Sequence, residues 1–197
     1  LNPAEALKKS RDAQRISDLS TLKTALGLYL TSTTTPYLGS LTANTACKVT
    51  PSGAYVSGDD IFYSIGSGSA TLADATIDGG STNNPQHVQV ATPALTDGTG
   101  WIPVNFDTLT GGSPISNLPV DPTNTISTVS AIASTDLVYR YACSATPLAF
   151  EIDAQLESTA YTSTDNKLTT DGGNSTAYYE VGTNLKILGS GSNNTDY

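Results

Sequence analysis

Residues 1–30, LNPAEALKKSRDAQRISDLSTLKTALGLYL, form the one stretch of this 197-residue chain that predicts a long helix without ambiguity. Its apolar side chains recur at three- and four-residue steps, the period of one helix face. They are Leu7, Ile16, Leu19, Leu22, Leu26, Tyr29 and Leu30. Asn2 suits the N-cap, Pro3 suits the first helical position, and Glu5 lies where a capping box places its acid. We therefore predict a helix from about Pro3 to Thr31.

This helix is longer than its own domain requires. At 1.5 Å per residue it spans about 40 Å, more than a body of this size needs to cover its core. Its remaining faces carry charged side chains, namely Lys8, Lys9, Arg11, Asp12, Arg15, Asp18 and Lys23. We expect the C-terminal part of the apolar stripe to pack on the chain's own sheet, and the first turns to contact something outside the chain.

The helix and the rest of the chain carry opposite net charges. Residues 1–23 contain five of the nine basic residues and three acids, a formal balance of +2, whereas residues 24–197 have a balance of −11. An acidic body argues against a nucleic-acid-binding face, because it repels phosphate. The basic helix is expected to meet an acidic neighbour or anionic lipid; the alternative is a solvated helix face.

Length and composition favour one extracellular domain. A chain of 197 residues predicts a single domain and buries roughly 70% of its unfolded surface, which is enough for its own core. Charged residues make up only 14% of the chain, and Ser, Thr, Asn and Gly are abundant. This composition is typical of secreted or surface-exposed β-rich proteins.

The two cysteines, Cys47 and Cys143, occur without CxxC or Cys/His metal spacing. We expect a disulfide between them; the alternative is two buried thiols. The disulfide would stabilise the fold by roughly 4–5 kcal/mol in the chain-entropy model, because it closes a long loop. It would also imply an oxidising compartment.

The clearest strands lie late in the chain. Residues 137–143 (LVYRYAC) are β-branched and aromatic, and residues 148–156 alternate apolar with polar side chains. The alternation predicts one buried face and one solvated face, with Glu151 and Asp153 in solvent. The two runs predict an antiparallel hairpin.

Further strands are predicted at 178–181 and 185–188, and shorter ones at 61–65 and 88–91, whereas residues 72–77 fit a helical turn or a strand equally well. The predicted fold is α+β, with a long N-terminal helix packed on an antiparallel β-sheet and a long loop-rich insertion between them. The chain then divides into the helix (1–32), the variable loop region (33–100), the sheet with its loops (101–188) and a flexible polar tail (189–197).

Several segments, taken in order, resemble the type IV pilins and the type II secretion pseudopilins. They are the helix itself, GWIPV (100–104), GGSPISNLPVDP (111–122), LVYRYAC, LAFEIDAQLES (148–158) and YYEVGTNLKIL (178–188). LPVDP, just before the first sheet strand, resembles the LPxDP segment of pseudopilins. The resemblance covers most of the chain outside residues 35–98.

The resemblance implies a structural subunit of an extracellular type IV pilus-like filament. Copies would pack helix against helix at the cell surface and serve adhesion, motility, DNA uptake or secretion, with a pilus or pseudopilus assembly machinery as partner. The implied subunit-interface residues are Leu1, Ala4, Leu7, Lys8, Arg11 and Arg15.

Members of this superfamily begin with a methylated Phe and an apolar segment that anchors the subunit in the inner membrane before assembly. We expect such a segment to precede Leu1, and it would be the chain's only contact with a membrane. Pro3 lacks an N–H group, so we predict a local break in the helix just before it.

The resemblance also implies a calcium ion. Related major pseudopilins bind calcium in a loop after their first sheet strands, with carboxylate and carbonyl oxygens. The corresponding loop here contains Asp165, Asn166, Asp171 and Asn174 around Gly172 and Gly173. We expect Asp165 and Asp171 as ligands; the alternative is ordinary Asp-Gly-Gly turn chemistry. No other cofactor is expected.

Catalytic chemistry has little support in the residues. His87 is the only histidine and is expected in a loop, and no Ser-His-Asp arrangement or phosphate-binding glycine motif is present. We therefore expect no enzymatic activity.

The alternative function is a secreted or surface-attached module, adhesin-like or carbohydrate-binding, with residues 36–100 as its recognition surface. The first helical turns discriminate between the two: a monomeric head should bury both helix ends, whereas a filament subunit leaves the first turns exposed.

Overall fold

The computed structural model describes residues 2–66, 72–74, 76, 86–128 and 130–189. Helix α1 (Pro3–Ser32) has the predicted extent to within one residue. The Asn2 side chain accepts a hydrogen bond from the Ala4 N–H at 3.1 Å. Glu5 does not complete the expected capping box, because its carboxylate accepts hydrogen bonds from the backbone N–H and hydroxyl of Thr159. An acid in the first turn still complements the helix dipole there.

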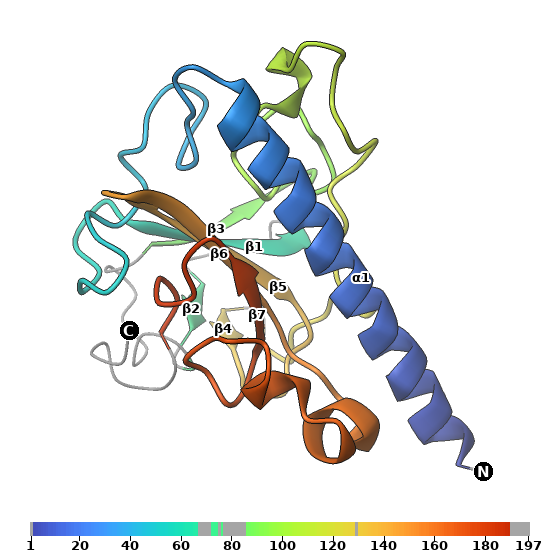
Figure 1. The fold of residues 1–197 in the computed structure, drawn as a ribbon. Helices are drawn as coiled ribbons and strands as arrows, with labels where there is room; N and C mark the ends of the chain where they lie inside the picture. The colour runs from blue at the N-terminus through green and yellow to red at the C-terminus, as the bar shows by residue number, and fades with distance from the viewer. Residues whose placement is uncertain (1, 67–71, 75, 77–85, 129, 190–197) are drawn as a thin grey trace.

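Five strands form the main sheet in the order β3–β1–β5–β6–β7. They are β1 (Asp60–Gly66), β3 (Gln86–Val90), β5 (Tyr139–Ala145), β6 (Leu148–Ala154) and β7 (Tyr179–Gly182). The expected β5–β6 hairpin is present, and α1 lies across one face of the sheet (Figure 1). The α+β class is therefore correct, but the sheet is mixed rather than purely antiparallel, because β3 runs parallel to β1.

Shorter elements complete the fold. They are the parallel pair β2 (Ala73–Asp74) and β4 (Ala131–Ile132), the 3₁₀ turns η1 (Phe106–Thr108) and η3 (Lys167–Thr169), and the π-helical turn η2 (Ala160–Thr164). Residues 33–100 do not form an insertion outside the sheet, because they supply β1 and β3. Most of the expected flexible tail lies outside the described residues.

The face of the sheet toward α1 carries the larger hydrophobic core. Leu19, Leu22 and Leu26 of α1 are fully buried there against side chains of β5 and β6, such as Phe150. Trp101 joins this core, and its indole N–H donates to the Pro119 carbonyl at 2.9 Å.

The expected disulfide is present on this side of the sheet. It links Cys47 to Cys143 of β5, with a Cα–Cα distance of 4.7 Å. The neighbouring backbone continues the connection, since the Lys48 N–H donates to the Cys143 carbonyl at 2.9 Å. The disulfide therefore fixes the chain after α1 to a central strand.

The opposite face of the sheet is also buried, and the expectation that Glu151 and Asp153 lie in solvent is wrong. Their exposed fractions are 0% and 1%. The residues before Gly189 cover this face, although they do not form the strand expected at 185–188. The alternation along β6 correctly predicts that one face of the strand is apolar and the other polar. It cannot show that another segment of the chain covers the polar face.

Glu151 holds this covering segment in place. Its carboxylate accepts hydrogen bonds from the backbone N–H groups of Ile187 and Leu188 at 2.7 and 2.8 Å. The Lys48 ammonium and the Tyr55 hydroxyl donate to the Ile187 carbonyl at 2.9 and 3.0 Å. The backbone polar groups of the covering segment thus find partners in a buried site, as they must.

Burial changes the titration of three acids on this face. Burial, with help from neighbouring carboxylates, raises the pKa values of Glu151 and Asp153 well above their ordinary range. Burial also raises the pKa of Glu180. The folded chain therefore binds protons that the unfolded chain has released, and stability falls as pH rises from about 4 through the folded pKa values.

We expect the free energy of unfolding to fall between about pH 5 and pH 7, and Glu151→Gln to reduce that fall by about 1 kcal/mol, since one pKa unit corresponds to about 1.4 kcal/mol. The amide keeps an oxygen for the two N–H groups. Burial lowers the pKa of Lys48 to about 7, so its opposite contribution begins at about pH 6 and acts equally in both proteins.

Urea denaturation at the two pH values measures the effect. The control, Asp165→Asn, removes an acid whose side chain is 62% exposed and should leave the pH dependence unchanged. An undiminished fall in Glu151→Gln would contradict the assignment of this pH dependence to Glu151.

Candidate functional site: the first turns of the helix and their anchor

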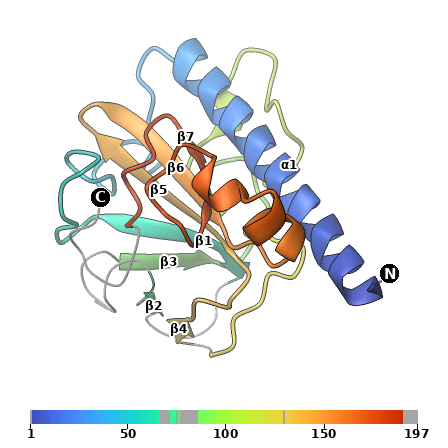
Figure 2. The same cartoon turned by 60° about the horizontal axis from the view of Figure 1, so that its bottom comes forward.

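The first turns of α1 extend past the sheet, with η2 beside them (Figures 1 and 2). Ala4, Ala6, Leu7, Lys9 and Ser10 are all exposed. Leu7 has the second-largest exposed fraction among the large hydrophobic side chains described, 62%. The N-terminal end of the helix is therefore bare toward solvent, whereas the core begins at Leu19.

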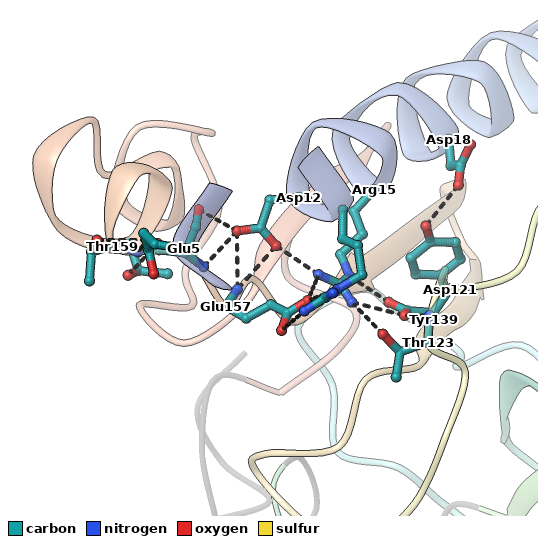
Figure 3. A network of polar contacts seen from close by, with 12 residues as sticks. Glu5, Asp12, Arg15, Asp18, Asp121, Thr123, Tyr139, Glu157 and Thr159 are labelled. Carbon is teal, nitrogen blue, oxygen red and sulfur yellow. Dashed lines mark hydrogen bonds and ion pairs between the residues drawn. The ribbon is translucent and has the colours of Figure 1, made fainter. Parts of the chain in front are cut away.

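Arg15 fixes the helix to the body just beyond these turns (Figure 3). Its guanidinium donates to both carboxylate oxygens of Asp121, at 2.6 and 3.0 Å, and to Asp12 and Glu157 at 2.7 and 2.8 Å. The side chains of Arg15, Asp12 and Asp121 are all fully buried. Burial opposes the charge of Arg15, but its hydrogen bonds to Asp121, Glu157 and Asp12 raise its pKa above the ordinary value. The guanidinium therefore stays charged inside the protein.

Asp121 belongs to the LPVDP segment, and the turn that follows it orients its carboxylate. Its carboxylate also accepts hydrogen bonds from the backbone N–H groups of Thr123 and Asn124 at 2.8 and 3.3 Å. Pro122 fixes the backbone between the acid and these donors. The segment thus presents a preorganised carboxylate to the helix.

The segment after β6 is fixed to the helix from the other side. Arg11 binds Glu157 through two hydrogen bonds of 2.6 and 2.7 Å. Hydrogen bonds from Arg11 and Arg15 lower the pKa of Glu157 to about 2, so this carboxylate is ionised at any physiological pH. Asp12 accepts hydrogen bonds from the Glu157 N–H and from the N–H and hydroxyl of Ser158.

One further contact continues this network along the helix. The Tyr139 hydroxyl of β5 donates to Asp18 at 2.9 Å (Figure 3). Together with the hydrogen bonds from Thr159 to the Glu5 carboxylate, these contacts extend over almost four turns of α1. They hold the base of a projecting helix rigidly against the body.

Arg15 was expected on an exposed face at a subunit interface, and this placement is wrong because its charge is buried in its own chain. A signal for burial is present in the sequence. Asp12 and Arg15 continue the three- and four-residue steps of Leu19, Leu22 and Leu26 toward the N-terminus. Charged residues at core positions predict a buried ion pair, but the partners Asp121 and Glu157 are too far away in sequence to be found this way.

The other expected interface residues are placed as follows. Leu1 lies outside the described residues, and Ala4 and Leu7 are exposed. Lys8 lines an open hollow of about 300 Å³ together with Gln155 and Glu157. The Arg11 side chain is 34% exposed and paired with Glu157. Contacts between copies of the chain remain a prediction.

A groove of about 240 Å³ lies beside the second half of α1. Its lining combines one face of the helix with the loop after η1, and consists of Ser20, Thr21, Thr24, Ala25, Leu28, Pro114 and Ile115. Leu28 is 46% exposed within it. The sequence does not predict this groove, because the loop that forms its second wall lies about eighty residues after the end of the helix.

The expected calcium ligands have separate partners. Asp165 pairs with Lys167 at 2.8 Å, and Asp171 accepts hydrogen bonds from the N–H groups of Gly173 and Glu180. Nowhere in the described part of the chain do three or more His, Cys, Asp or Glu side chains form a group that could hold a metal ion. Calcium binding by Asp165 and Asp171 stays a prediction.

His87 lies in β3 rather than in the expected loop, and its ring lies 5.9 Å from that of Tyr63, centroid to centroid. The absence of enzymatic activity stays an expectation. Over the described residues, no helix combines the length and the apolar character needed to span a membrane. Comparison with protein-family models, characterised proteins and solved structures gives no match.

We expect Asp121→Asn to destabilise the fold by about 3 kcal/mol, because removing one partner of a buried ion pair leaves the other charge uncompensated. Chemical denaturation of the two proteins measures the loss. Thr123→Ala is the matched control: its hydroxyl accepts only a long 3.4 Å hydrogen bond from Arg15, so the change should stay within about 0.5 kcal/mol. Equal effects of the two substitutions would show that the Arg15–Asp121 pair does not fix the helix.

Proposed function

We propose that this protein is a structural subunit of an extracellular type IV pilus-like filament and that it assembles through the first turns of α1. Such a filament would serve adhesion, motility, DNA uptake or secretion at the cell surface, and a pilus or pseudopilus assembly machinery would build it from identical copies. The order of sequence segments that resembles pilins and pseudopilins agrees with the α+β fold.

The observation that carries the proposal is a rigid helix end with an uncovered apolar side chain. A single exposed leucine is ordinary on a protein surface. Leu7 differs because it lies between Glu5 and Arg11, both of which are bonded to the body. The surrounding turns are thus held in one conformation without being covered. A preorganised surface loses little conformational entropy when it binds a partner.

The distribution of charge supports assembly of like copies. Residues 1–23 have a formal balance of +2, and the remainder of the chain has a balance of −11. Opposite charges on different parts of the same chain favour approach of the helix of one copy to the body of another.

Electron microscopy of material sheared from the cells that make this protein tests the proposal directly. We expect thin filaments that bind antibodies against this chain. Cells that display the protein only as single molecules, with no labelled filament, would overturn the proposal.

We expect Leu7→Asp to abolish these filaments while leaving the stability of the folded monomer within about 0.5 kcal/mol, because the position is exposed and an acid is tolerated in the first turns of a helix. Labelled filaments are counted by microscopy, and stability is measured by urea denaturation. Val49→Asp introduces the same charge at a side chain that is 66% exposed outside the helix, and it serves as control. Equal filament yields from both variants would exclude the first turns as the assembly surface.

A further inference from the structure

We propose that the first turns of α1 dock on a second copy of this chain, in the groove between α1 and the loop at Pro114–Ile115, with Leu7 as the inserted side chain. The proposal rests on the filament function above and names the contact that would build it. Leu7 and the groove lie on different parts of each copy, so every subunit would offer one of each.

The groove has the size and the lining that a leucine requires. Its volume is about 240 Å³, and an apolar cavity of about 150 Å³ already accepts a benzene-sized group. The helix contributes small side chains, Ser20, Thr21 and Thr24, which leave the apolar Leu28 and Ile115 accessible. A leucine placed there would contact apolar atoms on both walls.

The second wall of the groove is preformed. Two backbone hydrogen bonds fold the loop, from the Leu109 N–H to the Phe106 carbonyl and from the Gly112 N–H to the Leu109 carbonyl. The Ser113 hydroxyl donates to the Ile115 carbonyl at 2.6 Å. The ring of Phe106 packs edge-on against Tyr29 in the last turns of α1, with a centroid distance of 6.0 Å. The groove therefore needs no rearrangement to receive a partner.

Charge complementarity selects the occupant. Asp97 and Asp107 are exposed, and the Thr96 hydroxyl donates to Asp107 at 3.2 Å. Asp107 belongs to η1, whose Phe106 packs against Tyr29, the residue that follows Leu28 of the groove. Residues 49–139, which include the loop wall, contain no basic residue, and Asp97 and Asp107 are the exposed acids among the described part of this range. The first turns of α1 bring Lys8 and Lys9 alongside Leu7. A second copy thus supplies both an apolar side chain and the cations that this acidic end of the molecule attracts.

The proposed contact is also compatible with an open filament. A contact between two different surfaces of one chain is heterologous, and it propagates as an open filament unless its rotation closes a ring. The apolar Leu7 and a groove elsewhere on the same chain are such a pair. The docking contact and the filament are therefore consequences of the same arrangement.

Cysteine cross-linking in the full protein tests the contact. Cys47 and Cys143 are paired and buried, so the double variant Leu7→Cys, Ile115→Cys carries the only free thiols. Mild oxidation of its filaments should give a ladder of dimers, trimers and higher species on a non-reducing gel, because each copy forms two links. Leu7→Cys with Val49→Cys is the matched control and should give no ladder.

A second variant blocks the groove. Thr24 is exposed, and Thr24→Trp should leave the melting temperature unchanged while filling the groove and abolishing the ladder in the cross-linking background. A persistent ladder would overturn the proposal. Dimers from Leu7→Cys alone, without higher species, would also overturn it, because they show a symmetric contact between first turns.

The outcomes separate this proposal from the function on which it rests. If the wild-type protein forms filaments but the double cysteine variant gives no ladder, the groove contact is refuted and the filament function is left intact. A ladder from protein that forms no filaments refutes the function and keeps the contact. The absence of both refutes both.

Discussion

The structure depends on one buried cation. Arg15 lies inside the protein with three carboxylates around it, from its own helix, from the LPVDP turn and from the segment after β6. A buried ion pair contributes little net stability compared with an apolar core, because desolvation offsets the attraction, yet removing one partner is costly. We interpret the network as a device of specificity: only one axial position and rotation of α1 satisfies all of these partners at once. The apolar stripe from Leu19 to Leu26 supplies the hydrophobic free energy, and the ion pairs of Arg15 fix the axial position and rotation of α1.

The polar contacts also fix the first turns of α1, which lie beyond the apolar core. A helix held only by apolar contacts would fray where the core ends, since the first turns cover little of the sheet. Polar contacts at Glu5, Arg11 and Asp12 instead fix the turns without covering their outer side. The result is a projecting, ordered and basic helix end, which is what a docking element needs and what an isolated domain does not.

Both faces of the sheet are buried, each by a different means. The face toward α1 is an ordinary apolar core closed by the disulfide of Cys47 and Cys143. The opposite face carries ionisable groups, and Glu151 and Lys48 accommodate the polar backbone of the segment that covers them. Burial of several acids on this side raises their pKa values, whereas hydrogen bonds from Arg11 and Arg15 lower the pKa of Glu157 on the α1 side.

The sequence by itself determined the elements that local pattern controls: helix α1 from its 3.6-residue period and its Asn-Pro start, the β5–β6 hairpin from alternation around a turn, the α+β class, and the pairing of the only two cysteines. It also contains the polar side chains of both networks, but it does not show which of them bind one another. Only the tertiary structure decided that Arg15 and Glu151 are buried, that β3 joins the sheet in parallel, and that a groove opens beside α1. The physical reason is distance along the chain: Asp121 and Glu157, two of the three carboxylate partners of Arg15, lie more than a hundred residues away from it. Local periodicity reports which face of an element is polar but not which segment will cover it.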